Sequence, residues 1–104
     1  MLLPAVTRFS IPGAVERYAD CARAIGVANC ATSDDSAARA LLHELVALNE
    51  ELQVPTVKQF GIAKDAYFDR TVLMAEQALA SGSPGNNPRV PTVKQIVDLY
   101  EQLW

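Results

Sequence analysis

The sequence predicts an all-α protein of about five helices in a compact bundle, and three observations lead to this prediction. Apolar residues recur at spacings of three and four in several segments, which is the period of an amphipathic helix. Oxygen-bearing residues or proline stand where these segments begin, and glycine or proline stands where they end. No segment combines sustained apolar–polar alternation with β-branched enrichment, so no strand is expected.

The first two helices are expected on either side of a short connection. The first lies between Gly13 and Gly26, and glycine at the second position favours the left-handed backbone that ends helices. Ser33 is the expected N-cap of the second helix, which ends before Pro55 because a residue preceding proline avoids the helical region. The apolar stripes consist of Val15, Tyr18, Ala19, Ala22 and Ile25 in the first helix and of Ala38, Leu41, Leu42, Leu45, Val46, Leu48 and Leu52 in the second.

One six-residue segment, Val-Pro-Thr-Val-Lys-Gln, occurs twice, at 54–59 and at 90–95. In each copy the threonine can accept from the glutamine N–H while the glutamine side chain reaches back to the threonine N–H, as in a capping box. We expect the first copy to start one or two helical turns that end at Gly61, and the second to start a helix that continues to Trp104. A match this short is reuse of a good helix start, not a structural repeat.

A further helix is predicted over residues 66–80. Its apolar side consists of Phe68, Val72, Ala75 and Leu79. Residues 81–88, which come after it, are dense in turn formers. This run lacks the lysine of a phosphate-binding loop and the glycine spacing of a dinucleotide-binding turn, so we interpret it as a connector.

Length and composition are those of a single globular domain spanning residues 1–104, with half of the residues apolar. The net charge of −3 argues against a nucleic-acid partner, because phosphate binding needs a basic surface. No apolar stretch approaches the ~20 residues needed to cross a bilayer. The apolar start is too short and lacks the basic residues of a signal peptide, so we expect a soluble cytoplasmic protein with no membrane partner.

No set of residues forms a recognisable catalytic or metal site, and we predict neither a catalytic residue nor a metal ligand. His43, the only histidine, lies about 150° around its helix from the leucine stripe, so we expect it to face water. The acidic pairs at 34–35 and 50–51 fit a helix start and a polar helix face. Cys21 and Cys30 have no metal-binding spacing, and we predict both to be reduced and buried.

Three stretches occur in an order and at spacings that are typical of one known family. They are Leu2-Leu3-Pro4-Ala5-Val6-Thr7-Arg8-Phe9, then Glu16-Arg17-Tyr18-Ala19 with Ala24-Ile25-Gly26, and Asn87-Pro88-Arg89 leading into Thr92 and Ile96-Val97-Asp98-Leu99-Tyr100. Together they resemble the C-terminal end of the iron-containing, metal-dependent alcohol dehydrogenases, and the resemblance covers nearly the whole chain. It implies the C-terminal portion of the helical domain of such an enzyme.

The resemblance also implies what a full-length enzyme contains. Members have an N-terminal nucleotide-binding α/β domain and a helical domain, with Fe²⁺ or sometimes Zn²⁺ held by one Asp and three His. All four ligands lie upstream, the last in a His-Gly-x-x-Asn-Ala stretch just before the Leu-Leu-Pro that is here residues 2–4. The family reaction is hydride transfer from an alcohol carbon to NAD(P)⁺, with the metal as Lewis acid. We therefore expect a C-terminal fragment without its own metal or nucleotide, inactive by itself.

Ser83 is the one position that the resemblance links to the substrate. Relatives often carry a cysteine four residues before the asparagine of Asn-Pro-Arg, near the substrate pocket, and Ser83 occupies that position here. A serine would change the polarity of this pocket in a complete enzyme. The alternative is that Ser83 is simply a residue of a tight loop.

Two further interpretations concern partners. A helical interaction module without enzymatic activity would use the apolar side chains of Leu2, Leu3, Val6 and Phe9 for self-association or docking, because a small chain gains core by pairing. Alternatively, a separate N-terminal chain would supply the missing metal ligands and the nucleotide-binding domain. A second copy and the N-terminal portion of the enzyme are thus both candidate partners.

Overall fold

The computed structural model describes all residues, 1–104, as helices and connections. The α-helices are α1 (Leu2–Ser10), α2 (Val15–Ala24), α3 (Asp34–Glu51), α4 (Lys64–Phe68), α5 (Thr71–Ala80) and α6 (Val93–Glu101), and the 3₁₀ turns are η1 (Ile11–Gly13) and η2 (Ser83–Asn86). There is no strand, so the all-α prediction is confirmed. No helix is both long and apolar enough to span a membrane.

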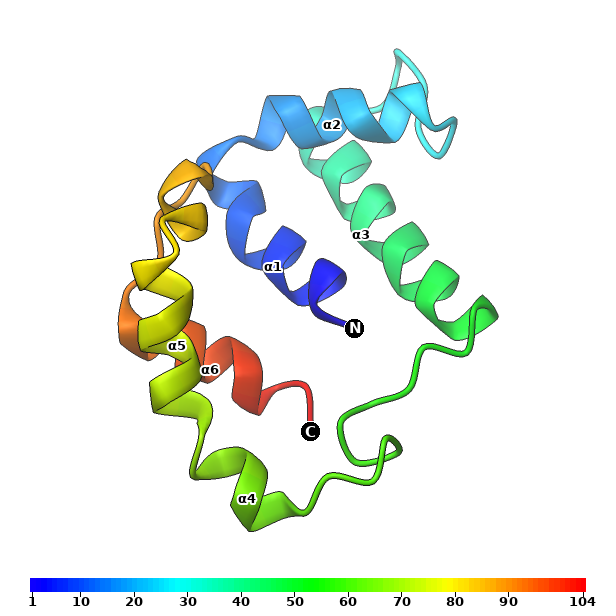
Figure 1. Cartoon of the computed structure of the whole chain (residues 1–104). Coiled ribbons are helices and arrows are strands. Elements are labelled where there is room, and N and C mark those ends of the chain that lie inside the picture. Colours follow the sequence, from blue (N-terminus) through cyan, green and yellow to red (C-terminus); the bar gives the residue numbers. More distant parts are fainter.

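The helices form two pairs with α1 between them (Figure 1). α2 packs on α3, α5 packs on α6, and α1 contacts both α3 and α6. The molecule measures 47 × 30 × 17 Å and has a radius of gyration of 15.2 Å, whereas a compact domain of this length has a radius of about 13 Å. The arrangement is therefore flatter and more open than a compact bundle.

Small residues bring α2 and α3 into close contact. Ala19, Ala22 and Ala37 are completely buried and form the core of this pair together with Leu41. Because alanine has no side-chain atom beyond Cβ, two helix backbones can approach closely where several alanines meet. The predicted stripe of the first helix is thus confirmed at its centre. Its last member, Ile25, is 56% exposed, since it lies one residue past the end of α2.

The leucine stripe of α3 is covered along only part of its length. Leu41 is buried and Leu45 is half-buried, but Leu48 and Leu52 are exposed. The short helix α2 covers only the N-terminal half of the much longer α3, as Figure 1 shows. The last turns of α3 therefore keep an apolar face that no helix of this chain fully covers.

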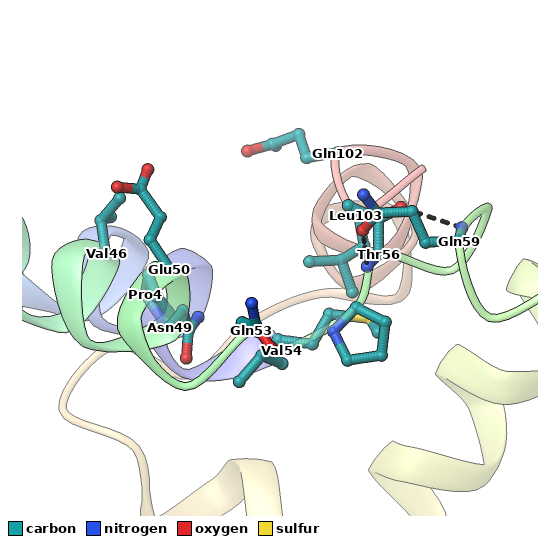
Figure 2. A pocket seen from close by; sticks show the side chains of 12 residues that line it. Pro4, Val46, Asn49, Glu50, Gln53, Val54, Thr56, Gln59, Gln102 and Leu103 are labelled. Carbon is teal, nitrogen blue, oxygen red and sulfur yellow. Dashed lines mark hydrogen bonds between the residues drawn. The ribbon is translucent and has the colours of Figure 1, made fainter.

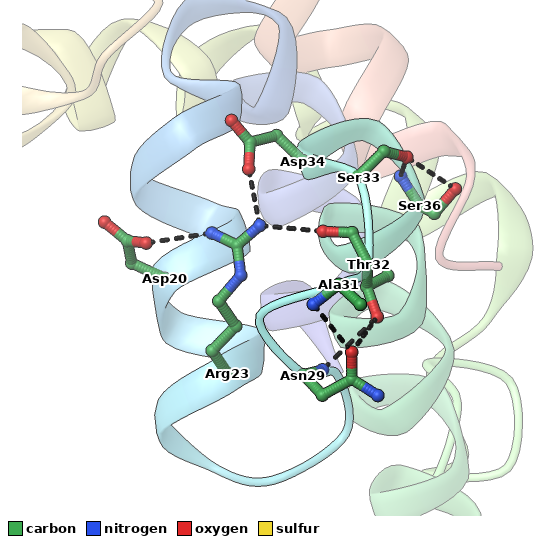
Figure 3. Close-up of polar contacts among 8 residues, drawn as sticks. All are labelled: Asp20, Arg23, Asn29, Ala31, Thr32, Ser33, Asp34 and Ser36. Carbon is green, nitrogen blue, oxygen red and sulfur yellow. Dashed lines mark hydrogen bonds and ion pairs between the residues drawn. The ribbon is translucent and has the colours of Figure 1, made fainter.

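Arg23 ties α2 to the start of α3, as Figure 3 shows. Its guanidinium donates hydrogen bonds to the Thr32 carbonyl at 2.9 Å and to a carboxylate oxygen of Asp34 at 2.6 Å, and it also pairs with Asp20 at 3.0 Å. The predicted N-cap is confirmed, because Ser33 Oγ accepts a hydrogen bond from a backbone N–H of the first turn at 3.4 Å. Side-chain contacts thus fix the connection between the two helices.

Apolar periodicity does not predict α1. The face that this helix buries carries Pro4, Thr7 and Ser10, so two of its three buried side chains end in hydroxyl groups. Ser10 Oγ lies 2.7 Å from the Val6 carbonyl, a bond within the helix that offsets part of the cost of burying the hydroxyl. Proline is tolerated in the first turn of a helix because the N–H groups there lack helical partners.

The single helix predicted over 66–80 is wrong, because the chain breaks between α4 and α5 at residues 69–70. The Arg70 N–H bonds three residues back to Tyr67, and the Thr71 hydroxyl donates to the Phe68 carbonyl at 2.9 Å. These short-range bonds replace the four-residue pattern of an α-helix. The buried positions are consequently Tyr67, Thr71 and Ala75, whereas the predicted core residue Val72 is 53% exposed.

The break allows α4 to reach the end of the chain. The Tyr67 hydroxyl donates a 2.8 Å hydrogen bond to the carbonyl of Tyr100 on α6. The rings of Tyr67 and Phe68 lie 5.7 and 6.0 Å from that of Trp104, measured between centroids. Tertiary aromatic contacts of this kind outweigh the local preference for one continuous helix.

Both copies of the repeated hexapeptide form the predicted reciprocal bonds. Thr56 and Gln59 exchange them at 3.2 and 2.9 Å, and Thr92 and Gln95 at 3.3 and 2.9 Å. The second copy caps α6, but the first initiates only a hydrogen-bonded turn, which ends at Gly61 in a left-handed conformation. The cap is a property of the hexapeptide, and the length of helix depends on the residues C-terminal to it.

Candidate functional site

An apolar cavity of about 370 Å³ lies between α1, η2 and α6. This volume is within the range of ~300–1,000 Å³ that is typical of pockets for small molecules. The wall combines side chains from distant parts of the sequence, among them Leu2, Val6, Phe9, Ser83, Asn86 and Tyr100. The structure therefore brings the first helix and the Gly-rich connector together around one hollow.

Ser83 lies in the wall of this cavity and is exposed. Gly82, with φ of +78°, takes the left-handed conformation that begins η2, and Pro84 fixes the backbone of its first turn. The Ser83 N–H donates to Ser81 Oγ at 3.3 Å. The predicted connector therefore has a defined shape, and that shape places Ser83 in the cavity wall.

A second hollow, of about 620 Å³, lies between the start of α1, the end of α3 and the C-terminal residues (Figure 2). Its polar side chains include Asn49, Glu50, Gln53, Gln59 and Gln102. Figure 2 shows the Glu50 carboxylate on α3 at its edge. With one carboxylate and several amides, the hollow lacks the pair of titratable groups that acid–base chemistry uses.

The remaining candidates from the sequence lie apart from one another. His43 is exposed on α3, as predicted. Asp34 pairs with Arg23 at the start of α3, which is consistent with a role at the helix start. The prediction that Cys21 and Cys30 are buried is wrong, because both are exposed free cysteines. The buried face of α2 is made of alanines, and Cys30 belongs to the connection after α2.

The side chains of this chain do not fit a metal ion of the kind the resemblance implies. Iron and zinc sites in enzymes use at least three protein ligands such as His, Cys, Asp and Glu. No three such side chains lie close enough together to hold a metal, and the one histidine faces outward. No strand precedes the Gly-rich connector either, so it does not form a dinucleotide-binding turn. We therefore assign no step of hydride transfer to these residues.

Only some of the residues that line the apolar cavity could be identified from the sequence. Ser83 follows from the resemblance, and Val6 and Phe9 stand out as apolar residues. That α1 and η2 form one wall could not be predicted, because Ser10 and Asn87, which contact each other, are separated by 77 positions. Sequence spacing reports neighbours along one helix, not contacts between distant segments.

The fold and the cavity define an all-helical unit with an apolar cavity between α1, η2 and α6. Its sequence matches the model of the family described as "Fe-containing alcohol dehydrogenase family, C-terminal" over residues 1–104. The chain therefore belongs to the Fe-containing alcohol dehydrogenase family, as the resemblance implied.

Individual relatives agree with this assignment. Lactaldehyde reductase of Escherichia coli (strain K12) is 32% identical over 105 aligned residues, which cover all of this chain and 26% of the relative. NADPH-dependent butanol dehydrogenase of Clostridium saccharobutylicum is 28% identical over 98% of this chain and 26% of the relative. The crystal structure of a 1,3-propanediol oxidoreductase superposes with a TM-score of 0.86 at 26% identity, and covers 99% of this chain and 26% of its own. The chain thus spans about a quarter of the length of these proteins.

Proposed function

We propose that the chain forms the C-terminal helical part of a metal-dependent alcohol dehydrogenase and has no dehydrogenase activity by itself. The observation that carries the proposal is the extent of the match, which covers all of residues 1–104 but only 26% of lactaldehyde reductase. The parent reaction is the interconversion of an alcohol with an aldehyde or ketone, with NAD(P) as hydride carrier. In this proposal the metal and the nucleotide are held by other parts of the enzyme.

Within that enzyme, residues of this chain contribute a wall of the alcohol pocket. The cavity between α1 and η2 has the size and the apolar lining that suit a small alcohol. Ser83 places a hydroxyl where the resemblance expects a cysteine, so the wall is more polar at this point. The proposed roles of these residues are binding and exclusion of water, not proton or hydride transfer.

The first test uses the chain alone. Purified chain is incubated with Fe²⁺, NAD⁺ or NADP⁺, and 1,2-propanediol or a primary alcohol, and the reduced nucleotide is followed by its absorbance. We expect no turnover above a protein-free control. Sustained turnover would show that residues 1–104 contain a complete active site and would refute the proposed inactivity.

The second test uses a chimera in which residues 1–104 replace the matching segment of E. coli lactaldehyde reductase. We expect the chimera to fold and to reduce lactaldehyde. All of residues 1–104 align with that enzyme, and the fold agrees with a solved relative. A chimera that is folded and loaded with metal but inactive would contradict the proposal. The unmodified reductase is the positive control.

An interaction module is the second candidate, because the chain exposes large apolar side chains. On α1, Leu2 and Leu3 are 42% and 57% exposed, and at the end of α3, Leu48 and Leu52 are exposed as well. These side chains would be covered in a pair of identical chains. Light scattering of the purified chain distinguishes the two candidates, since a stable dimer favours the module and a monomer at high concentration favours the enzyme fragment.

A further inference from the structure

Two segments far apart in the sequence meet beside the apolar cavity. One is the end of α1 with η1, and the other is the stretch after η2, which lies next to the α1–α2 junction in Figure 1. We call their contact the clasp and define it by Phe9, Ser10 and Gly13 on one side and Asn87, Pro88 and Arg89 on the other. Three separate contacts hold it together.

The first contact is a hydrogen bond from a buried hydroxyl. Ser10 is completely buried, and its Oγ lies 2.9 Å from Asn87 Oδ1 and 2.7 Å from the Val6 carbonyl. A hydroxyl has one proton and both partners are acceptors, so the Ser10 hydroxyl donates to the Val6 carbonyl and to Asn87 Oδ1 as one shared, three-centre hydrogen bond. Asn87 Nδ2 in turn donates to the Arg89 carbonyl at 2.7 Å. Both ends of the Asn87 amide are thereby used.

The second contact is a close backbone approach. A Cβ atom added to Gly13 would lie 2.8 Å from the Pro88 carbonyl oxygen and 3.0 Å from its carbon. Both atoms belong to the backbone, so they could make room only if the segment itself moved. Gly13 is therefore required for space, and this approach sets how near the two segments lie.

The third contact stacks a charge on a ring. The Arg89 guanidinium lies 4.2 Å from the centroid of the Phe9 ring, within the range of cation–π attraction, and an Arg89 nitrogen is 3.5 Å from the Phe9 carbonyl. Phe9 and Asn87 also line the apolar cavity. The clasp thus extends to the cavity wall itself.

No other hydrogen bond joins residues 81–91 to a distant part of the chain. Gly85 bonds to Gly82, Asn87 bonds through its N–H to Pro84, and Ser81 bonds to the end of α5. All of these are local and shape the connector without placing it against α1. The clasp therefore supplies the hydrogen bonds that join this connector to α1, in addition to the packing of η2 on α5 and of α5 on α6.

We propose that Asn87 and Gly13 are positioning residues that hold the wall containing Ser83 against α1 and thereby set the affinity of the parent enzyme for its alcohol. This inference rests on the proposed function. If the clasp opens, η2 moves away from α1 and the cavity loses its shape. Chemistry at the metal and the nucleotide, which other segments supply, is affected less.

The test compares Asn87→Ala and Gly13→Ala with a matched control, Gly85→Ala. Gly85 lies in the same connector, has an ordinary φ, does not line the cavity, and has nothing within 4 Å of an added Cβ. Ser10→Ala removes the Ser10–Asn87 hydrogen bond from its other end, at a buried residue that does not line the cavity, so it separates loss of the clasp from loss of a direct contact between Asn87 and the alcohol. It replaces Asn87→Ala should that variant not fold, as judged by circular dichroism.

In the lactaldehyde reductase chimera, we expect the clasp variants to raise KM for the alcohol about tenfold with kcat changed less than about twofold. In the isolated chain, we expect the NMR shifts of the Arg89 side chain, which stacks on the Phe9 ring, to move toward unstructured values in Asn87→Ala and Gly13→Ala, with the shifts of α3 unchanged. The control, Gly85→Ala, should leave KM within about twofold of the unmodified protein and the Arg89 shifts unchanged.

The possible failures are distinguishable. An unmodified chimera that folds but has no activity would overturn the proposed function, and this inference with it. An active chimera in which the clasp variants leave KM unchanged would overturn the inference alone, as would unchanged Arg89 shifts in those variants. An equal effect of Gly85→Ala would also overturn it, because any change in the connector would then suffice.

Discussion

At the scale of residues, Tyr67 joins helix α4 to helix α6 and the C-terminal residues. It is 7% exposed, its hydroxyl donates to the Tyr100 carbonyl, and its ring contacts those of Phe68 and Trp104. Burial raises the pKa of the Tyr67 phenol above its usual value of 10.0, and the neighbouring Tyr100 adds to the effect. The folded chain therefore favours the protonated phenol, the form that can donate this hydrogen bond.

We expect Tyr67→Phe to lower the free energy of unfolding by about 1 kcal/mol near neutral pH, because one part-buried hydrogen bond is lost. Since the pKa is raised on folding, the stabilising contribution is complete below about pH 10 and is lost as the pH rises through the folded pKa. Urea unfolding at several pH values up to about 11 measures both effects. The gap between the two proteins should narrow above pH 10, and a constant gap would contradict this account. Tyr18→Phe is the control.

Ser83→Cys in the chimera tests the link between this position and the substrate. A thiol is less polar than a hydroxyl, so we expect the variant to lower KM for longer, more apolar alcohols by about two- to threefold. Steady-state kinetics with a series of primary alcohols checks this expectation. Ser36→Cys, on the exposed surface of α3, should have no effect. Identical kinetics for both variants would support the view that Ser83 is an ordinary loop residue.

At the scale of elements, the sequence predicts helices well where small or apolar residues form the buried face. The centre of α2, the cap and first half of α3, and the start of α6 agree with the prediction. α1 could not be predicted from apolar spacing, because Thr7 and Ser10 occupy its buried face. The break at 69–70 could not be predicted either, since it depends on the contact of Tyr67 with the distant α6. The clasp could not be predicted either, because Ser10 and Asn87 are 77 positions apart in the sequence.

The two copies of the hexapeptide allow an internally controlled measurement of capping. We expect Thr92→Ala to lower the free energy of unfolding by about 1 kcal/mol, because it removes the cap of α6. Thr56→Ala removes the same hydrogen bonds from a single turn that starts no α-helix, so its effect should be below about 0.5 kcal/mol. Chemical denaturation followed by circular dichroism measures both. Equal losses of unfolding free energy would mean that the turn at 56–61 contributes as much to stability as the cap of α6.

At the scale of the whole molecule, the chain exposes more surface than its mass requires. Its accessible surface is 6691 Å², whereas a compact monomer of 11.3 kDa has about 5,700 Å². The excess of about 1,000 Å² is comparable to the ~800 Å² that one partner buries in a standard interface. The open shape is thus consistent with a unit that another part of an enzyme, or a second copy, covers.

Leu52→Asp tests whether the exposed end of the α3 stripe is covered in a complete enzyme. In the isolated chain Leu52 is 65% exposed, so we expect a change below about 0.5 kcal/mol. In the chimera, a charge buried without a partner should lower the melting temperature by about 4 °C or more. Ala47→Asp, at another exposed position of α3, is the control. An equally small effect of Leu52→Asp in both proteins would show that this face stays in water.

The approach of Gly13 to Pro88 also has a consequence for how the family can vary. A side chain at position 13 would first meet the Pro88 backbone, so a change of a neighbouring side chain cannot by itself make room for it. A homologue that replaces this glycine must also have a different backbone path at residues 87–89, through an insertion, a deletion or another type of turn. We therefore expect the two segments to diverge together among homologues, as one inherited unit.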